Sequence, residues 1–462
     1  GYRGPDRARR PRRRDGRRRS LIVSERGDLR LRRDIGTLGA ALLILNGLIG
    51  AGIFALPGKV AVNLGTASPW LFLGVGIVFL SVVLTFAALS SYFEESGGPV
   101  LYARAAFGDA AGFATGWMIF VSRSAAFAAN VTVMATYLGA VLPWLEGTAG
   151  RVAVISLATA GLTWANVRGV RSGIGTMLVL TVFKLTPLLL LVLLGFTRLS
   201  GAALIPDLTD PMENLGSTTL LLVYAFVGFE TIGVTAGETA EPRRRLPGTL
   251  LRTVAAISLF YFCISLVFVS VIPPASYGES TLVDVGRRLL GPFGAIAITL
   301  AAVFSIGGNM SSSMLAAPRI LFALARLKML PPYLGRIHPQ FRSPHVAIVV
   351  MGVLCLGLAL SGTFTTLAVA STLSRLLSYV LCIGSLPRVR ATASPEQRRE
   401  AFALPGGLLV PALALAICLA LIAQTTLANW IAVAALLGVG IVLYLVASRR
   451  VAAQAADAQV ID

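Results

Sequence analysis

The chain has 462 residues, of which 56% are hydrophobic and 13% are charged. Its mean hydropathy is +0.79, and a soluble core of this length cannot bury so much apolar surface. The composition therefore excludes a soluble globular protein and predicts a protein whose main solvent is the lipid bilayer. The net charge of +19 resembles that of a nucleic-acid-binding protein, but about half of the excess lies in one N-terminal tail.

This tail, residues 1–34, carries 14 arginines and five acidic residues. It contains almost none of the apolar residues that a folded core needs. We predict a disordered cytoplasmic tail whose arginines set the topology and attract anionic lipid headgroups. RNA binding by the tail is the alternative. We expect no nucleic-acid partner, because the basic residues are not spread evenly over a surface.

Apolar stretches long enough to cross about 30 Å of hydrocarbon follow the tail. Their amides must be bonded within each segment, so we predict an all-α integral membrane protein with about 12 transmembrane helices. The predicted spans are 36–58, 69–93, 109–140, 151–166, 175–197, 215–237, 250–272, 290–323, 345–361, 364–386, 402–424 and 428–448.

Basic residues alternate between the loops. Short loops rich in arginine stay on the cytoplasmic side of a membrane, and the arginine-rich segments all fall on the side of the N-terminus. These segments are 168–171, 243–245, 319–342, 388–399 and 449–450. We therefore predict a multi-pass protein of the plasma or inner membrane with both termini in the cytoplasm, the second as a tail at 451–462.

The first span is interrupted by glycine. Gly47, Gly50 and Gly52 fall within six residues near its middle, where each costs about 1 kcal/mol of helix propensity relative to alanine. A break would free main-chain groups, and the half-helix after Gly52 would present N–H groups that favour an anion. Close packing of small residues between helices is the alternative interpretation.

The sixth span has a similar interruption. The stretch 224–233 contains two glycines and, at Glu230, a carboxylate at mid-depth. Interruptions at corresponding places in two halves indicate a transporter built from inverted repeats, with its site at the midplane of the bilayer. We predict repeat 1 at 35–200 (helices 1–5), repeat 2 at 215–390 (helices 6–10) and two more helices at 400–450.

Several strings in these spans resemble one known superfamily. GLIGAGIF, from Gly47 to Phe54, and YAFVGFE, from Tyr224 to Glu230, are similar to signatures of the amino acid, polyamine and organocation (APC) superfamily. The resemblance covers residues 34–450. It implies a LeuT-like fold with 5+5 inverted repeats and broken helices 1 and 6, and transport of amino acids or related amines. Further matches are Gly97-Gly98-Pro99, Ala236-Gly237-Glu238 and Glu241-Pro242.

The resemblance also implies how the substrate is bound. The carboxylate of the amino acid meets main-chain amides of the first break, and its ammonium meets carbonyls of the second. Aromatic side chains beside the second break close over the substrate or supply a cation–π face, with ordinary packing as the alternative. The residues expected to bind substrate are Ile49, Gly50, Ala51, Gly52, Tyr224, Phe226, Val227, Gly228 and Asn309.

Lys184, Glu230 and Phe229 are candidates for coupling or gating. Lys184 is the one lysine deep within a span, and a lysine can give up its proton whereas an arginine effectively cannot. In some proton-coupled members, the resemblance implies, such a fifth-helix lysine stands where sodium-coupled relatives hold the ion. Glu230 must be protonated, paired or hydrated, and the resemblance links it to gating. A purely structural role is the alternative for each.

Other polar groups lie in the spans. The hydroxyls of Ser305 and of 311–313 suggest a sodium site with first-helix carbonyls, but Lys184 would occupy the same cavity, so we expect protons rather than sodium. Arg123 and Arg375 each need a partner or water. We expect Arg375 to be a permanent structural cation.

The sequence contains no constellation typical of an enzyme. Its two histidines, His338 and His345, precede the ninth span together, and we find no zinc, nucleophile–base or phosphate-binding motif. We predict no catalytic residue, no metal and no cofactor.

The predicted function is secondary transport of amino acids by alternating access, with proton-coupled uptake. Exchange of amino acids or polyamines without proton coupling is the alternative, and a transporter-like sensor or a channel is more remote. Small apolar residues at Ala51, Ala225 and Val227 favour neutral amino acids, whereas Asn309 favours a polar or cationic side chain. The oligomeric state stays open.

Overall fold

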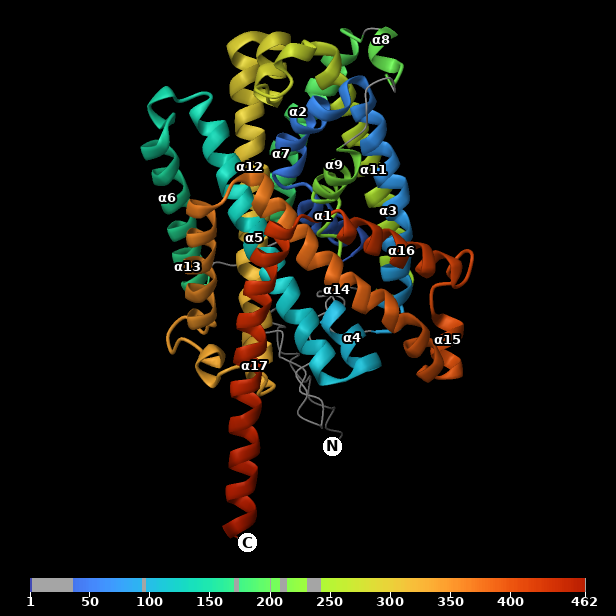
Figure 1. Ribbon diagram of the computed structural model, residues 1–462, viewed down its shortest axis with the longest axis vertical. Coiled ribbons are helices and arrows are strands. Elements are labelled where there is room, and N and C mark those ends of the chain that lie inside the picture. The colour runs from blue at the N-terminus through green and yellow to red at the C-terminus, as the bar shows by residue number, and fades with distance from the viewer. Residues whose placement is uncertain are drawn as a thin grey trace.

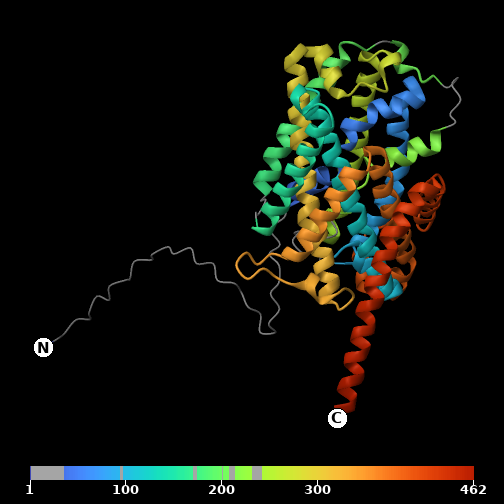
Figure 2. The ribbon, with the colours of Figure 1, turned by 60° about the vertical axis from the view of Figure 1, so that its left-hand side comes forward.

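The computed structural model describes Gly1 and residues 36–93, 97–169, 174–199, 201–207, 214–230 and 242–461. Apart from Gly1, the predicted tail lies outside these residues. The described part of the chain is helical and contains no strand, which agrees with the predicted all-α class. Figures 1 and 2 show the helices as one bundle, with α17 extending beyond it.

The helices follow one another in the order α1 (Thr37–Leu48), α2 (Gly52–Leu64), α3 (Ser68–Ser90), α4 (Pro99–Phe107), α5 (Asp109–Gly139), α6 (Thr148–Val167), α7 (Ile174–Phe196), α8 (Gly201–Leu204), α9 (Leu215–Val223), α11 (Pro242–Val271), α12 (Leu282–Arg326), α13 (His345–Ser361), α14 (Phe364–Thr392), α15 (Pro395–Glu400), α16 (Leu409–Ala423) and α17 (Leu427–Ile461). Short 3-10 turns join some of them, at η1 (Gly65–Ala67), η2 (Pro143–Leu145), η4 (Pro274–Ser276) and η5 (Pro332–Gly335).

Seven helical stretches of the described chain are long and apolar enough to cross a membrane. They differ in how far they are covered by other helices. In α5 94% of the apolar window is buried, whereas in α17 only 17% is buried. Helix α5 is therefore central, and α17 presents most of its apolar surface to lipid. The helices α1, α13 and α16 are apolar but shorter.

The centre of the bundle is built on close packing along α5. This helix lies against α14 and α12, and α3 lies against α11. Small residues let such helices approach closely in lipid, where the hydrophobic effect gives no drive for association. Gly116 of α5 illustrates the fit, because a Cβ there would come within 3.3 Å of Ile320 on α12. The short helices α1 and α9 end inside this frame (Figure 1).

Helix boundaries differ from the predicted spans in places. Helix α12 starts at Leu282 rather than near 290, because Thr281 and Asp284 form a capping box at its N-terminus. The helix then kinks at Gly291, whose φ of +63° suits glycine. The backbone of α17 stays helical to Ile461, through the segment predicted as a tail.

Candidate functional site

The chain between α1 and α2 is not helical. Helix α1 ends at Leu48, α2 begins at Gly52, and Ile49 has φ −81° and ψ +87°. The first amides of α2 therefore have no acceptor in a preceding turn of helix. The glycines here allow close approach, because a Cβ on Gly50 would lie 3.1 Å from Asn309 and one on Gly52 would lie 3.1 Å from the Cα of Ala225.

A second non-helical segment, 224–230, follows α9 and crosses the first. Gly228 has a φ of +118°, and a Cβ at this position would lie 2.4 Å from the carbonyl oxygen of Gly47. Only glycine satisfies both the backbone conformation and the space. The two irregular segments are thus in direct contact. The chain after Glu230, up to 241, lies outside the described residues.

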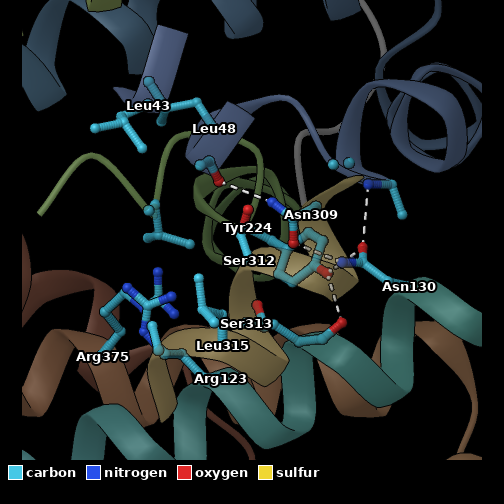
Figure 3. A pocket seen from close by; sticks show the side chains of 18 residues that line it. Leu43, Leu48, Arg123, Asn130, Tyr224, Asn309, Ser312, Ser313, Leu315 and Arg375 are labelled. Carbon is cyan, nitrogen blue, oxygen red and sulfur yellow. Dashed lines mark hydrogen bonds between the residues drawn. The ribbon is translucent and has the colours of Figure 1, made fainter. Parts of the chain in front are cut away.

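A cavity of about 120 Å³ lies beside the two segments. Figure 3 shows its lining side chains, with Arg123 and Arg375 on one side and Asn130 and Asn309 on the other. Its walls come from α1, α2, α5, α12, α14 and segment 224–230. The lining residues are Leu43, Gly47, Leu48, Gly50, Ala51, Gly52, Arg123, Ala126, Asn130, Tyr224, Val227, Gly228, Asn309, Ser312, Ser313, Leu315, Ala316 and Arg375.

Two asparagines tie the irregular segments to α5 and α12. The N–H of Ala51 donates to Asn130 Oδ1 at 3.1 Å, and Tyr224 Oη donates to the same oxygen at 3.1 Å. Asn130 Nδ2 donates to Asn309 Oδ1 at 2.8 Å, and Asn309 Nδ2 donates to Gly47 O at 3.0 Å. Buried main-chain groups need such partners once the helix is interrupted, so the asparagines replace lost helical hydrogen bonds.

Lys184 is fully buried on α7, next to the first irregular segment. Its Nζ donates to Asn46 Oδ1 at 2.8 Å and to Ile49 O at 3.3 Å. Asn46 is itself held by Thr181 at 2.9 Å, and Ser305 Oγ of α12 donates to Ile49 O at 2.9 Å. The ammonium of Lys184 therefore donates to two neutral oxygens.

Glu230 lies in a cluster of charged side chains below the cavity. Its Oε1 lies 3.0 Å from Arg375 Nη1 and 3.8 Å from Arg123 Nη2. Its Oε2 accepts from Tyr379 Oη at 2.7 Å and from the N–H of Gly228 at 3.0 Å. The three charged side chains are 1 to 7% exposed. From the sequence, each charge within a span requires a partner. In the structure Arg123 and Arg375 both pair with Glu230.

Seven of the nine residues expected to bind substrate line the cavity, and two do not. Ile49 lines another cavity, and its carbonyl accepts from Lys184 and Ser305. Phe226 packs against Phe79 and Tyr261. Phe229, a gating candidate, packs in the same aromatic group, against Phe79 and Phe86.

Several residues of the site were not singled out from the sequence. Asn130 and Asn46 bond the first irregular segment and Lys184, and Tyr379 holds Glu230. One signal was available for the asparagines, because an amide in the middle of an apolar span is costly unless it has a partner. Tyr379 carries no such signal, since tyrosine is common in any span.

Comparison with known proteins agrees with this architecture. The family model described as amino acid permease matches residues 35–455. The serine/threonine exchanger SteT of Bacillus subtilis (strain 168) is 26% identical over 400 residues, covering 84% of this chain and 89% of that protein. The branched-chain amino acid permease BcaP of the same organism is 26% identical over 459 residues, covering 93% and 96%.

A solved structure shares the fold. The crystal structure of MhsT in complex with L-phenylalanine superposes with a TM-score of 0.59 at 14% identity, covering 84% of this chain and 97% of that one. The family model extends over almost all of the helical bundle, including both irregular segments and the cavity between them. The chain therefore belongs to the amino acid permease family, whose members are multi-pass membrane transporters.

Proposed function

We propose that the chain takes up amino acids by alternating access and couples their uptake to protons. The Lys184 site carries the proposal. Its Nζ donates to Asn46 Oδ1 at 2.8 Å and to Ile49 O at 3.3 Å, and Gly50, next to Ile49, lines the cavity. Loss of one proton from Lys184 thus turns charge-assisted hydrogen bonds into weaker neutral ones at the irregular segment that adjoins bound substrate.

Substrate binding follows the chemistry of the two irregular segments. The amino acid carboxylate binds at Gly50, Ala51 and Gly52, where the N-terminus of α2 favours an anion. The N–H of Ala51 donates to Asn130 Oδ1 at 3.1 Å. When substrate binds, an oxygen of its carboxylate replaces Asn130 Oδ1 as the acceptor of this N–H. The ammonium binds carbonyls at Val227 and Gly228.

The side chains around this position complete the proposed site. Tyr224 and Asn309 line the cavity and orient the substrate. Phe226 and Phe229 anchor the second segment by packing against Phe79, and Glu230 fixes it through the N–H of Gly228 at 3.0 Å. Ile49 contributes its carbonyl to the Lys184 site rather than a contact with substrate.

The transport cycle rests on the predicted architecture. In the proposal, about twelve spans form two inverted five-helix repeats, at 35–200 and 215–390, and their first helices are broken. Two more helices at 400–450 complete the bundle, and both termini lie in the cytoplasm. Exchange of conformation between the repeats then opens the site to one side of the membrane at a time.

Exchange without proton coupling is the second candidate function. One relative is named an exchanger, for serine and threonine, and another a permease, for branched-chain amino acids. The relatives thus support both modes. The neutral oxygens around Lys184 favour coupling, because an ammonium that they hold can lose its proton without leaving a buried counter-ion alone.

The test is uptake of a panel of radiolabelled amino acids into proteoliposomes, with and without an inward proton gradient. We expect accumulation driven by the gradient in the wild type and its loss in Lys184→Ala. Lys59→Ala, at an exposed position, is the matched control and should behave as wild type. Uptake that ignores both the gradient and Lys184→Ala would establish exchange instead, and binding without any flux would establish a sensor.

A further inference from the structure

The charge on the wall of the central cavity comes from two arginines. Among the described residues that line this cavity, Arg123 of α5 and Arg375 of α14 are those that carry charge at neutral pH. The remaining lining groups are main chain, amides, hydroxyls and apolar side chains. The two guanidinium groups lie next to each other on one side of the cavity (Figure 3).

The carboxylate of the cluster lies on the far side of these guanidinium groups. Glu230 does not line the central cavity but lines a second one, together with Arg123 and residues of α4 and the C-terminal half of α12. Both of its oxygens are engaged, by Arg375 at 3.0 Å, by Tyr379 at 2.7 Å and by the N–H of Gly228 at 3.0 Å. Glu230 is thus anchored behind the arginines, and the face they turn to the central cavity consists of N–H donors.

Arg375 is held in place before any ligand binds. Arg375 Nε donates to Ser122 Oγ at 2.8 Å and Nη1 lies 3.0 Å from Glu230, so its guanidinium plane is fixed on two sides. A guanidinium has five N–H donors and matches the geometry of a carboxylate. Arg375 is only 4% exposed, and its donors, fixed in advance, form a built site for an anion rather than a solvated surface charge.

We propose that Arg375 and Arg123 bind a carboxylate at the side-chain end of the substrate, so that the transported amino acids are acidic. The inference rests on the proposed function, which sets the substrate backbone at Gly50 to Gly52 on another wall of the cavity. A second carboxylate on the same substrate then reaches the guanidinium groups. A cationic side chain is repelled there, and a neutral one gains no charge attraction from the guanidinium groups.

The decisive comparison is between glutamate and glutamine, and between aspartate and asparagine. Within each pair the side chain ends in a carboxylate in one amino acid and in an amide in the other, and the rest of the molecule is the same. Binding to purified full-length protein is measured by isothermal titration, and uptake by proteoliposomes. We expect at least tenfold tighter binding of the acid than of its amide in the wild type. If glutamine or leucine binds at least as tightly as glutamate does, the acidic preference is wrong, while the proposed amino acid transport still holds.

Variants assign the preference to the arginines. Arg375→Gln should reduce the ratio of acid to amide affinity to about one, and Arg375→Lys, which keeps the charge and protects folding, should retain part of it. Arg151→Gln, exposed and outside the central cavity, is the matched control and should leave the ratio unchanged. If Arg375→Gln weakens leucine and glutamate equally, the arginines bind the backbone carboxylate and the inference is wrong. If no amino acid binds to the wild type, the proposed function fails with it.

Discussion

Two buried cationic sites, one on the wall of the central cavity and one bonded to Ile49 next to that wall, differ in what balances their charge. Among the residues that the structure describes, Lys184 on α7 donates to neutral oxygens, at 2.8 Å and 3.3 Å. Arg375 on α14 lies 3.0 Å from the carboxylate of Glu230. Neutral oxygens solvate an ammonium through their dipoles, whereas a carboxylate carries a full opposite charge.

The difference separates a site whose charge can change from one whose charge is fixed. Lys184 can become neutral while its oxygen partners stay neutral as well. Removing charge from Glu230 leaves buried arginines without their counter-ion, a loss that costs about 3–5 kcal/mol for buried ion pairs. We therefore assign a change of state during transport to the Lys184 site and permanence to the Glu230 cluster.

Glu230→Gln tests this comparison with the largest expected effect. It should lower the free energy of unfolding by about 3–5 kcal/mol, because two guanidinium groups lose one shared carboxylate. Lys184→Met should cost only about 1–3 kcal/mol, the penalty for leaving neutral acceptors unsatisfied. Equilibrium unfolding in mixed micelles measures both values.

The exposed Glu279 supplies the control for this experiment. Glu279→Gln should stay within about 0.5 kcal/mol of the wild type, as expected for a surface substitution. A larger loss of stability in Lys184→Met than in Glu230→Gln would reverse the comparison, and Lys184 would then be the fixed structural cation.

Tyr379→Phe sharpens the same comparison at the level of one hydrogen bond. Tyr379 Oη donates to Glu230 at 2.7 Å, and hydrogen bonds to charged groups contribute about 1.5–3 kcal/mol. The ring keeps its packing against Phe86, with centroids 4.8 Å apart, so the variant removes little besides the bond. We expect the free energy of unfolding to fall by an amount within that range, and no loss in Tyr333→Phe, because Tyr333 is 45% exposed. A neutral result for Tyr379→Phe would mean that the arginines alone hold Glu230.

The sequence indicated the position of the site better than its walls. Glycines at 47, 50 and 52 marked the irregular segment, because repeated glycine inside an apolar span needs a reason. Gly228 marked the second segment in the same way, although its contact with Gly47 depends on how two distant parts of the chain meet. The intramembrane charges required partners, but their identity was not readable, since Arg123, Glu230 and Arg375 come from three separate elements.

Side-chain direction was the part that periodicity did not resolve. Phe226 lies one residue from Val227, which lines the cavity, yet it packs against Phe79 and Tyr261. In a non-helical segment the directions of successive side chains follow from local dihedral angles, and no periodic pattern predicts them. The second role inferred for Arg375, expected only as a structural cation, likewise depends on a cavity that forms between elements.

Ser305→Ala carries the smallest expected effect and completes the comparison, because it removes a bond to a neutral acceptor. Ser305 Oγ donates to Ile49 O at 2.9 Å, and a neutral hydrogen bond contributes about 0.5–1.5 kcal/mol. Ile49 O keeps Lys184 as a second donor at 3.3 Å, so the loss should fall at the lower end. Ser311→Ala is the matched control on the same helix, since Ser311 Oγ donates to the carbonyl of Gly307 one turn back.

Transport distinguishes a structural from a coupling role for this hydroxyl. When Lys184 is the proton carrier, Ser305→Ala leaves it as the remaining side-chain donor to Ile49 O, and the segment depends more strongly on its protonation. The ratio of uptake with the gradient to uptake without it should therefore rise in Ser305→Ala and stay unchanged in Ser311→Ala. An unchanged ratio in both variants, with the expected loss of stability, would show that Ile49 O is held for structure alone and would place the coupling proton elsewhere.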